Sequence, residues 1–335
     1  MSNAIKQTTI PVIDISKLDG SESDRKQLIE DLRFAAHDVG FFYISGHNIP
    51  KFVTDNILSE TKKFFNHPVE EKAEIDNINS KQFRGYTRFG YELTNGTPDR
   101  REQIDIGPER ESIYEIAPEK RFLGLVGPNQ WPTFQPSLKP AVQDWLKYSQ
   151  EISLKVLSAL ALTLELPENF FEQWFDEQSH FHTKLIRYEG QGNDSSNQGV
   201  GAHKDYGFLA LLLQDNVGGL QVQTLDGEWV DAPPIEDTFV FNIGEVLEII
   251  TNGYFRATVH RVLSPKGNIE RFSIPFFYGP RLDAVITPIK LSAELTAQSR
   301  GIEADPNNPL IANYGENSLK GWLRAHPKVA EKYWN

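Results

Sequence analysis

The stretch Gly201-Ala-His-Lys-Asp-Tyr-Gly-Phe-Leu-Ala-Leu-Leu-Leu213 ends in a run of apolar residues that begins directly after a glycine. A short apolar run of this kind is typical of a β-strand that is buried on both faces. Similar runs recur around it between turn residues; they lie at residues 185–188, 220–224, 228–231, 238–243, 258–263 and 271–278. Many short strands at near-regular spacing predict a β-sandwich or jelly roll in this half of the chain.

Helical periodicity marks the earlier half of the chain and its C-terminal end. Apolar residues recur at helical spacing over residues 28–39, 52–65 and 138–164, and we expect another helix over residues 318–332. Residues 76–135 have little periodicity and many Gly, Pro, Arg and Asp residues, which predicts surface loops with short elements. The predicted fold class is therefore α+β, mainly β with flanking helices around a jelly-roll core.

The composition excludes several classes of function. The 335 residues carry a net charge of −12, which argues against broad electrostatic binding of nucleic acid or anionic membranes. The chain has no cysteine, so a disulfide framework, a thiolate nucleophile and a Cys-ligated metal are all excluded. The longest mostly apolar run, residues 156–164, is too short to span a bilayer. We expect a cytoplasmic protein whose metal ligands, if it has any, are His and carboxylates.

Three residues form a candidate metal site. His203 and Asp205 are two positions apart in a segment that we expect to be extended, so both side chains point to the same face. His260 lies on another predicted strand and could supply a third ligand. Two imidazoles and one carboxylate leave open metal positions, an arrangement that suits non-haem Fe(II) oxygen chemistry. An isolated His-x-Asp pair is weak support by itself, so the prediction depends on the surrounding motifs.

A basic residue accompanies this triad on the next predicted strand. Arg271 and Ser273 are again two positions apart and therefore share a face. An arginine can bind a carboxylate through two parallel hydrogen bonds, and the serine hydroxyl adds another donor. The pair predicts a pocket for a carboxylate close to the metal.

With these motifs the chain resembles the isopenicillin N synthase-like branch of the 2-oxoglutarate- and Fe(II)-dependent oxygenases. The resemblance spans nearly the whole chain and is specific, because many motifs match in order. The matching segments are Ile10-Pro-Val-Ile-Asp-Ile15, Gly40-Phe-Phe-Tyr-Ile-Ser-Gly-His47, Phe64-Phe65, His203-Lys-Asp205, Gly218-Gly-Leu-Gln-Val222, Asn242-Ile-Gly244, Thr251-Asn-Gly253, His260-Arg-Val262 and Arg271-Phe-Ser273.

The resemblance implies a double-stranded β-helix, a distorted jelly roll of the cupin kind, with flanking helices. It implies an N-terminal mixed α/β region over residues 1–135 that is not independent. A helix and the catalytic jelly roll would then occupy residues 136–335.

It also implies an oxidoreductase that uses Fe(II), 2-oxoglutarate and O₂ to oxidise a C–H bond of a small molecule, by hydroxylation or a related reaction, with release of succinate and CO₂. Neither nucleic acid nor a membrane is expected as a partner. The oligomeric state and the primary substrate do not follow from the sequence.

Residue by residue, the resemblance implies that His203, Asp205 and His260 bind Fe(II) and are the catalytic residues. Arg271 and Ser273 would hold the distal carboxylate of 2-oxoglutarate. Tyr188 stands where the family often has a tyrosine that contacts this cosubstrate, although Ile186 replaces the Asn that many plant members have two residues earlier.

Candidate substrate residues come from the irregular segment and from one predicted strand. The family forms part of its active-site mouth with this segment, which suggests Arg84, Tyr86 and Glu92 as substrate contacts, and Arg187 could also face the cavity. For each of them, a charged or polar residue on a solvated loop is the more ordinary interpretation.

Three alternatives stay open at this point. The first is an oxidase of the same family, isopenicillin N synthase-like or ascorbate-using, that does not consume 2-oxoglutarate. The second is a jelly-roll protein that binds a metal or ligand without catalysis. A zinc hydrolase is weaker, because no Glu stands beside the ligands in the sequence as a general base.

Overall fold

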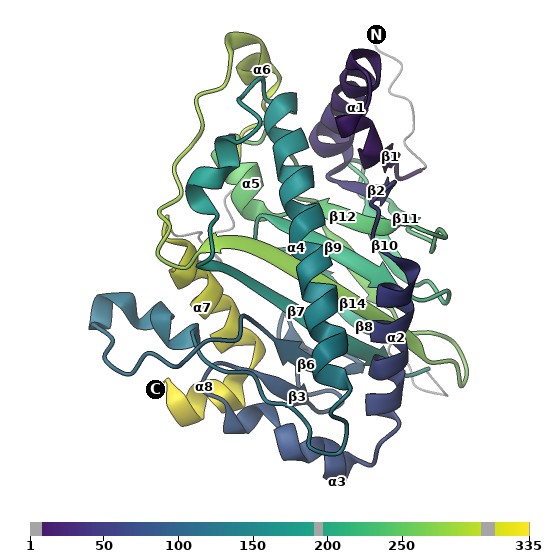
Figure 1. The fold of residues 1–335 in the computed structure, drawn as a ribbon, viewed down its shortest axis with the longest axis vertical. Helices are drawn as coiled ribbons and strands as arrows, with labels where there is room; N and C mark the ends of the chain where they lie inside the picture. Colours follow the sequence, from purple (N-terminus) through teal and green to yellow (C-terminus); the bar gives the residue numbers. More distant parts are fainter. Residues whose placement is uncertain (1–8, 191–196, 303–311, 335) are drawn as a thin grey trace.

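The structure of the protein is a computed structural model that describes residues 9–190, 197–302 and 312–334. Its largest element is an eight-stranded sheet (Figure 1) with the strand order β1-β2-β12-β9-β14-β7-β6-β3. The bounds of these strands are β1 Val12–Asp14, β2 Phe41–Ser45, β12 Phe239–Ile243, β9 Leu209–Gln214, β14 Arg271–Arg281, β7 Ser179–Tyr188, β6 Arg101–Ile106 and β3 Gly85–Thr87.

A smaller sheet of four strands has the order β11-β10-β13-β8, and a separate hairpin consists of β4 and β5. All neighbours in the smaller sheet are antiparallel. The bounds are β11 Trp229–Asp231, β10 Leu220–Gln223, β13 His260–Leu263, β8 Gln198–His203, β4 Leu93–Thr94 and β5 Thr97–Pro98.

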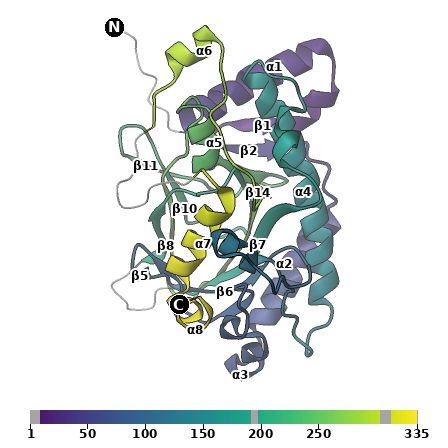
Figure 2. The same ribbon diagram turned by 90° about the vertical axis from the view of Figure 1, so that its left-hand side faces the viewer.

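Helices cover one face of the large sheet. The long helix α4 lies across β9 and β14, with α1 and α2 packed beside it (Figures 1 and 2). The helix bounds are α1 Glu22–Phe34, α2 Lys51–Phe65, α3 Val69–Lys72, α4 Leu138–Thr163, α5 Glu245–Ile250, α6 Ala293–Gln298, α7 Tyr314–Ala325 and α8 Pro327–Tyr333. In the described parts of the chain, no helix combines the length and the apolar character needed to cross a membrane.

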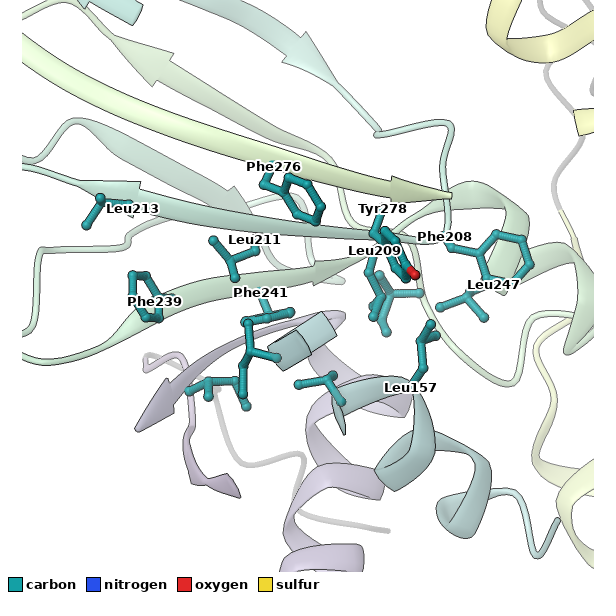
Figure 3. Packing of buried hydrophobic residues seen from close by; sticks show 14 of the residues in the cluster. Leu157, Phe208, Leu209, Leu211, Leu213, Phe239, Phe241, Leu247, Phe276 and Tyr278 are labelled. Carbon is teal, nitrogen blue, oxygen red and sulfur yellow. The ribbon is translucent and has the colours of Figure 1, made fainter. Parts of the chain in front are cut away.

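Strand β9 shows why the apolar runs of the sequence form the centre of the sheet. Leu209, Leu211 and Leu213 join the core beneath the helices, as Figure 3 shows. Ala210 and Leu212 alternate with them and line the cavity on the other face. Because both faces are buried, the strand reads as a continuous apolar run.

The second core lies between the two sheets. Tyr43 and Ile186 of the large sheet pack with Val200, Val222 and Val262 of the small sheet. Two facing sheets with helices on one side confirm the predicted α+β fold, mainly β with flanking helices. Strands β1, β2, β3 and β6 come from residues 1–135 and pair into the sheet of the later region. The boundary at residue 135 stays a prediction.

The structure corrects two expectations. Residues 76–135 are not only surface loops, because β3 and β6 extend the large sheet and every residue of β6 is buried. The charged residues of β6 interrupt the apolar pattern by which a buried strand is recognised in a sequence. They are buried in ion pairs, such as the pair of Glu102 with Lys72. The helix expected over residues 318–332 is in fact two helices, since Pro327 begins α8 after a break at His326.

Candidate active site

The three predicted metal ligands lie together at one end of the small sheet. His203 is the last residue of β8, and it pairs with His260, the first residue of β13. Asp205 lies two residues beyond the end of β8. One carboxylate oxygen of Asp205 is 3.5 Å from His203 Nε2 and 3.8 Å from His260 Nε2. The ligand atoms all lie within 4.8 Å of one another, so these three side chains can hold one metal ion.

Hydrogen bonds orient each side chain of the triad. His203 Nδ1 lies 2.8 Å from the Gly201 carbonyl oxygen, and His260 Nδ1 lies 3.1 Å from the Thr258 carbonyl oxygen. When both Nδ1 atoms donate to these carbonyls, both Nε2 lone pairs point toward the space between the three ligand atoms. Asn242 donates to the second oxygen of Asp205 at 2.7 Å. The orienting role of Asn242 was not predicted from the sequence.

The charges of the triad suit a divalent cation. Burial raises the pKa of Asp205, but His260, His203 and the bond from Asn242 outweigh burial and hold that pKa well below its usual range. Burial, together with the neighbouring His203, lowers the pKa of His260 to about 4. Burial also lowers the pKa of His203, but the hydrogen bond and charge of Asp205 outweigh burial and raise it. Asp205 is therefore ionised and His260 neutral at pH 7, as metal ligands must be.

A carboxylate pocket faces the triad from the large sheet. Arg271 and Ser273 lie on β14, and Arg271 pairs in register with Tyr188 on β7. The guanidinium carbon of Arg271 is 4.8 Å from the centre of the Tyr188 ring. Arg271 is completely buried and donates to Gln214 at 3.2 Å, whereas its Nε and Nη1 have no acceptor among the described residues.

Two unfilled N–H donors on a buried guanidinium are costly unless a ligand accepts from them. A carboxylate fits this pocket, because it can accept from Nη1 and neutralise the buried guanidinium charge. The residues present therefore fit one carboxylate end of 2-oxoglutarate. The two imidazoles and the carboxylate of the triad fit Fe(II).

One cavity of about 730 Å³ joins the triad and the carboxylate pocket. Besides these residues it is lined by the hairpin β4–β5 and by one face of α7. This volume is within the range of small-molecule sites, roughly 300–1,000 Å³. The cavity can hold a cosubstrate together with a second small molecule.

The four predicted substrate residues are placed differently from one another. Glu92 lines the cavity, whereas Arg84, Tyr86 and Arg187 do not. Tyr86 donates to Glu102 and is almost fully buried, as is Arg84. Arg187 is on β7 between Ile186 and Tyr188, both of which line the cavity, so alternation along the strand directs it to the opposite face. Three of these four residues therefore lie outside the cavity lining, and none of the four is an ordinary solvated residue.

A buried cluster of charges surrounds the predicted residue Glu92 on the cavity wall. Lys184 Nζ lies 3.0 Å from Glu92 and 2.8 Å from Asp105. Arg101 lies 3.2 Å from the same Glu92. Burial alone raises the pKa of Glu92, but Arg101 and Lys184 outweigh burial and hold it well below its usual range. Lys184 was not predicted, although counting back in steps of two from Tyr188 would have found it. Arg101 and Asp105 belong to the irregular segment that the resemblance placed at the active-site mouth.

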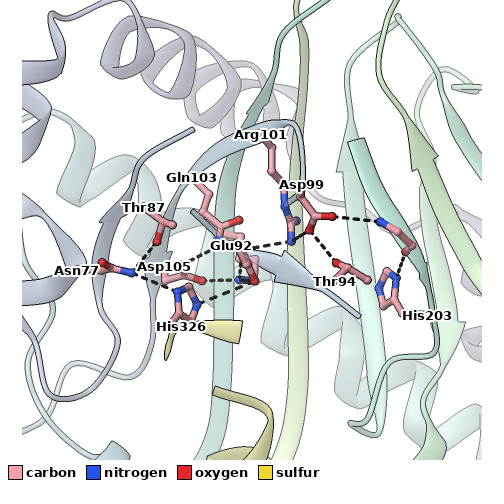
Figure 4. A network of polar contacts seen from close by, with 12 residues as sticks. Asn77, Thr87, Glu92, Thr94, Asp99, Arg101, Gln103, Asp105, His203 and His326 are labelled. Atoms are coloured by element: carbon pink, nitrogen blue, oxygen red, sulfur yellow. Dashed lines mark hydrogen bonds and ion pairs between the residues drawn. The ribbon is translucent and has the colours of Figure 1, made fainter. Parts of the chain in front are cut away.

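Asp99 connects this wall to the metal triad (Figure 4). Its first carboxylate oxygen accepts from the Gly201 backbone N–H and from Gln198, each at 3.2 Å. Its second oxygen accepts from Thr94 at 2.7 Å and from Arg101 at 3.2 Å. Because the Gly201 carbonyl contacts His203, the chain of contacts runs from the cavity wall to a predicted metal ligand.

Glu245 was also missed. It begins α5, lines the cavity, and its backbone N–H donates to the Asp205 carbonyl at 2.8 Å. Burial raises its pKa to about 7. A carboxylate thus does stand near the triad in space, although no sequence neighbour suggested one.

Comparisons with known proteins give a consistent result. The family described as "2OG-Fe(II) oxygenase superfamily" matches residues 180–280, and "non-haem dioxygenase in morphine synthesis N-terminal" matches residues 10–134. These two segments contain most of the large sheet, the predicted triad and the carboxylate pocket.

Individual relatives cover most of the chain. A "2-oxoglutarate-dependent dioxygenase frbJ" from Dothideomycetidae sp. is 33% identical, over 97% of this chain and 92% of the relative. A "Homoarginine-6-hydroxylase" from Glycine max is 35% identical, over 84% of this chain and 88% of the relative. A full-length Neurospora crassa protein, solved in complex with alpha-KG and thymine, matches with a TM-score of 0.76 and 26% identity, over 95% of this chain and 98% of that structure.

Proposed function

Because this chain belongs to the 2OG-Fe(II) oxygenase superfamily, we propose that His203, Asp205 and His260 are its Fe(II) ligands and that Arg271, Ser273 and Tyr188 bind 2-oxoglutarate. The chain is an oxidoreductase, a 2-oxoglutarate-dependent dioxygenase that uses Fe(II), 2-oxoglutarate and O₂. The single observation that supports the assignment of residues is the convergence, in one cavity, of the triad and the two unfilled donors of Arg271.

When bound, Fe(II) with 2-oxoglutarate and O₂ supplies the oxidation of a substrate C–H bond, with succinate and CO₂ as the other products. The protein residues position the reactants. Asn242 fixes Asp205 through one oxygen and leaves the other for the metal. Arg271 neutralises one carboxylate of the cosubstrate and orients it, and its stacking on Tyr188 holds the guanidinium in place. Buried apolar residues of both sheets, such as Ile186 of the large sheet and Val262 of the small sheet, exclude water from this end of the cavity.

The alternatives are not favoured. Relatives at 33% and 35% identity are named a 2-oxoglutarate-dependent dioxygenase and a homoarginine-6-hydroxylase, which argues against a non-catalytic binding protein and against a hydrolase. An oxidase that does not consume 2-oxoglutarate would leave the buried Arg271 donors without an acceptor.

Relatives act on small molecules, as the structure with thymine and the name homoarginine-6-hydroxylase state. We extend this to the present chain and propose hydroxylation of a small polar molecule. The polar and charged wall around Glu92 and Lys184 supports a polar substrate. The acidic net charge supports the proposal that neither nucleic acid nor a membrane is a partner. The cytoplasmic location stays a prediction.

The test is conversion of 2-oxoglutarate to succinate by the purified chain with Fe(II) and O₂, without added substrate and with a metabolite panel. Wild type is expected to form succinate, and His203→Ala and Asp205→Ala are expected to lose this activity together with tight Fe(II) binding. His67→Ala is the matched control, because His67 is half-buried just beyond the end of α2, where it contacts Glu71. Equal succinate formation by wild type and Asp205→Ala would contradict the assignment.

A further inference from the structure

Helix α5 contacts the segment of chain that carries the first two predicted metal ligands. The backbone N–H of Glu245, its first residue, donates to the Asp205 carbonyl oxygen at 2.8 Å. The next backbone N–H, that of Val246, donates to the Gly207 carbonyl oxygen at 3.1 Å. Directly before the helix, a Cβ atom on Gly244 would lie 2.1 Å from the same Gly207 oxygen, so only a glycine allows this close approach. The start of α5 therefore fixes the chain around Asp205.

The side chain of Glu248, also on α5, connects this segment to the one that carries the third predicted ligand. One of its carboxylate oxygens accepts from Lys204 Nζ at 2.9 Å, and the other accepts from the Ala257 backbone N–H at 3.0 Å. Lys204 lies between the first two ligands in the sequence, and Ala257 lies three residues before the third. One carboxylate thus joins the two segments, and both of its oxygens are used.

Short steps lead from each end of this bridge to the ligand side chains. Lys204 is the chain neighbour of two ligands, so a fixed Lys204 side chain limits the movement of both. At the other end, Thr258 follows Ala257, and the Thr258 carbonyl oxygen lies 3.1 Å from His260 Nδ1. The separation between the two halves of the triad therefore depends on the bridging carboxylate.

The bridge is only partly open to solvent. The Glu248 side chain is 15% exposed, and the Lys204 side chain is 31% exposed. An exposed ion pair contributes little to stability, but a carboxylate that also accepts from a backbone N–H has its position fixed twice. The bridge is therefore placed to restrain the geometry of the triad more than to stabilise the fold.

We propose that Glu248 is a positioning residue for the metal site. It holds the segment of His203 and Asp205 at a fixed separation from the segment of His260. The inference rests on the proposed function, which assigns these three residues as the ligands. Ligands that are held in place before the metal arrives lose less conformational entropy when it binds. Metal affinity should therefore depend on Glu248.

The test is titration of the full chain with Co(II), whose visible absorption spectrum reports its coordination geometry. Imidazole and carboxylate ligands bind Co(II) as well as Fe(II). Glu248→Gln keeps the size of the side chain and one acceptor oxygen, but it removes the charge that pairs with Lys204. We expect the Kd for Co(II) to rise about tenfold. The spectrum of the saturated variant should also differ from that of the wild type, because the triad is no longer held in one arrangement.

Variants of Lys204 test the same bridge from its other end. Lys204→Met removes the charge and should raise the Kd about threefold to tenfold, since the bond from Ala257 to Glu248 remains. Lys204→Arg keeps a cation opposite Glu248 and should retain the wild-type Kd within about twofold. Because both residues act through one contact, Glu248→Gln combined with Lys204→Met should raise the Kd less than the product of the two single effects.

Lys155→Met is the matched control. Lys155 forms a comparable ion pair with Asp19 at 2.5 Å, and its side chain is 25% exposed. Lys155 is on α4 and does not line the cavity. This variant should bind Co(II) with the Kd and the spectrum of the wild type.

A wild-type Kd and spectrum in Glu248→Gln would overturn the proposal, even if the variant unfolds at a lower urea concentration, because Glu248 would then serve the fold alone. Single effects that multiply in the double variant would refute the shared bridge. The proposed function is tested separately by Asp205→Ala. Loss of Co(II) binding in Asp205→Ala without any effect in Glu248→Gln refutes only this inference, whereas Co(II) binding that Asp205→Ala retains refutes the ligand assignment itself.

Discussion

Replacement of Asp99 by Asn tests the connection between the cavity wall and the metal triad. The Asp99 carboxylate is completely buried and accepts four hydrogen bonds, two on each oxygen. An asparagine retains one acceptor oxygen, and its NH₂ group then faces two donors. The substitution keeps the shape of the side chain, so its effect reports on charge and hydrogen bonding.

The expected cost can be worked out from these contacts. A hydrogen bond to a charged group contributes about 1.5–3 kcal/mol, and breaking a buried ion pair costs about 3–5 kcal/mol. Glu92 still lies 3.2 Å from Arg101 in the variant, so that guanidinium keeps one partner. We therefore expect Asp99→Asn to lower the free energy of unfolding by about 3 kcal/mol. Because the Gly201 N–H loses its acceptor while its carbonyl positions His203, Fe(II) affinity should fall about tenfold.

Urea unfolding followed by circular dichroism measures the first effect, and Fe(II) titration under anaerobic conditions measures the second. Asp55→Asn is the matched control: Asp55 is exposed and pairs with Lys51 on the surface of α2, so a change within about 0.5 kcal/mol is expected. An Asp99→Asn protein with the stability and Fe(II) affinity of the wild type would refute the reasoning.

Three further predictions concern the pocket, acid stability and α7. Arg271→Gln removes the unfilled donors, so the KM for 2-oxoglutarate should rise about tenfold to a hundredfold in the succinate assay; an unchanged KM would exclude Arg271 as the carboxylate receptor. Burial, followed by the charge of Lys184, holds the pKa of His182 well below 6.5. Below pH 6.5 only the unfolded state binds a proton at the His182 imidazole. The contribution of neutral, buried His182 to the free energy of unfolding is therefore complete above pH 6.5 and is lost as the pH falls. His182→Gln should reduce the slope of unfolding free energy against pH by up to about 1.4 kcal/mol per pH unit in urea titrations from about pH 5 to 8, and an unchanged slope would contradict this. Gly279→Ala places a Cβ against the Tyr314 hydroxyl of α7 and should destabilise the fold by about 1–3 kcal/mol in urea, whereas wild-type stability would show that α7 adjusts freely.

The strands and the triad could be predicted because their signals are local. The apolar run that becomes β9 is continuous in the sequence, and the spacing of His203 and Asp205 places both on one side of the chain. Their approach to His260 depends on the pairing of β8 with β13, which no local pattern gives. The family motifs supplied that long-range information.

The substrate side of the cavity was predicted only in part, with Glu92, for two physical reasons. Strand β6 has charged residues where a buried strand normally has apolar ones, and partners far along the chain neutralise them, as Lys184 does for Asp105. Trp322 reaches the cavity because one face of α7, a helix far from the strands in the sequence, lines it. Alternation along β7 does separate Lys184 from Arg187, and that rule was available in the sequence.

The most direct measurement of the central claim is oxygen-isotope labelling of succinate. The purified chain is incubated with Fe(II), 2-oxoglutarate and ¹⁸O₂, and the succinate is analysed by mass spectrometry. A dioxygenase that relies on His203, Asp205 and His260 will form succinate that contains one oxygen atom from O₂, and Asp205→Ala will form none. Unlabelled succinate from the wild type, or equally labelled succinate from Asp205→Ala, would contradict the account.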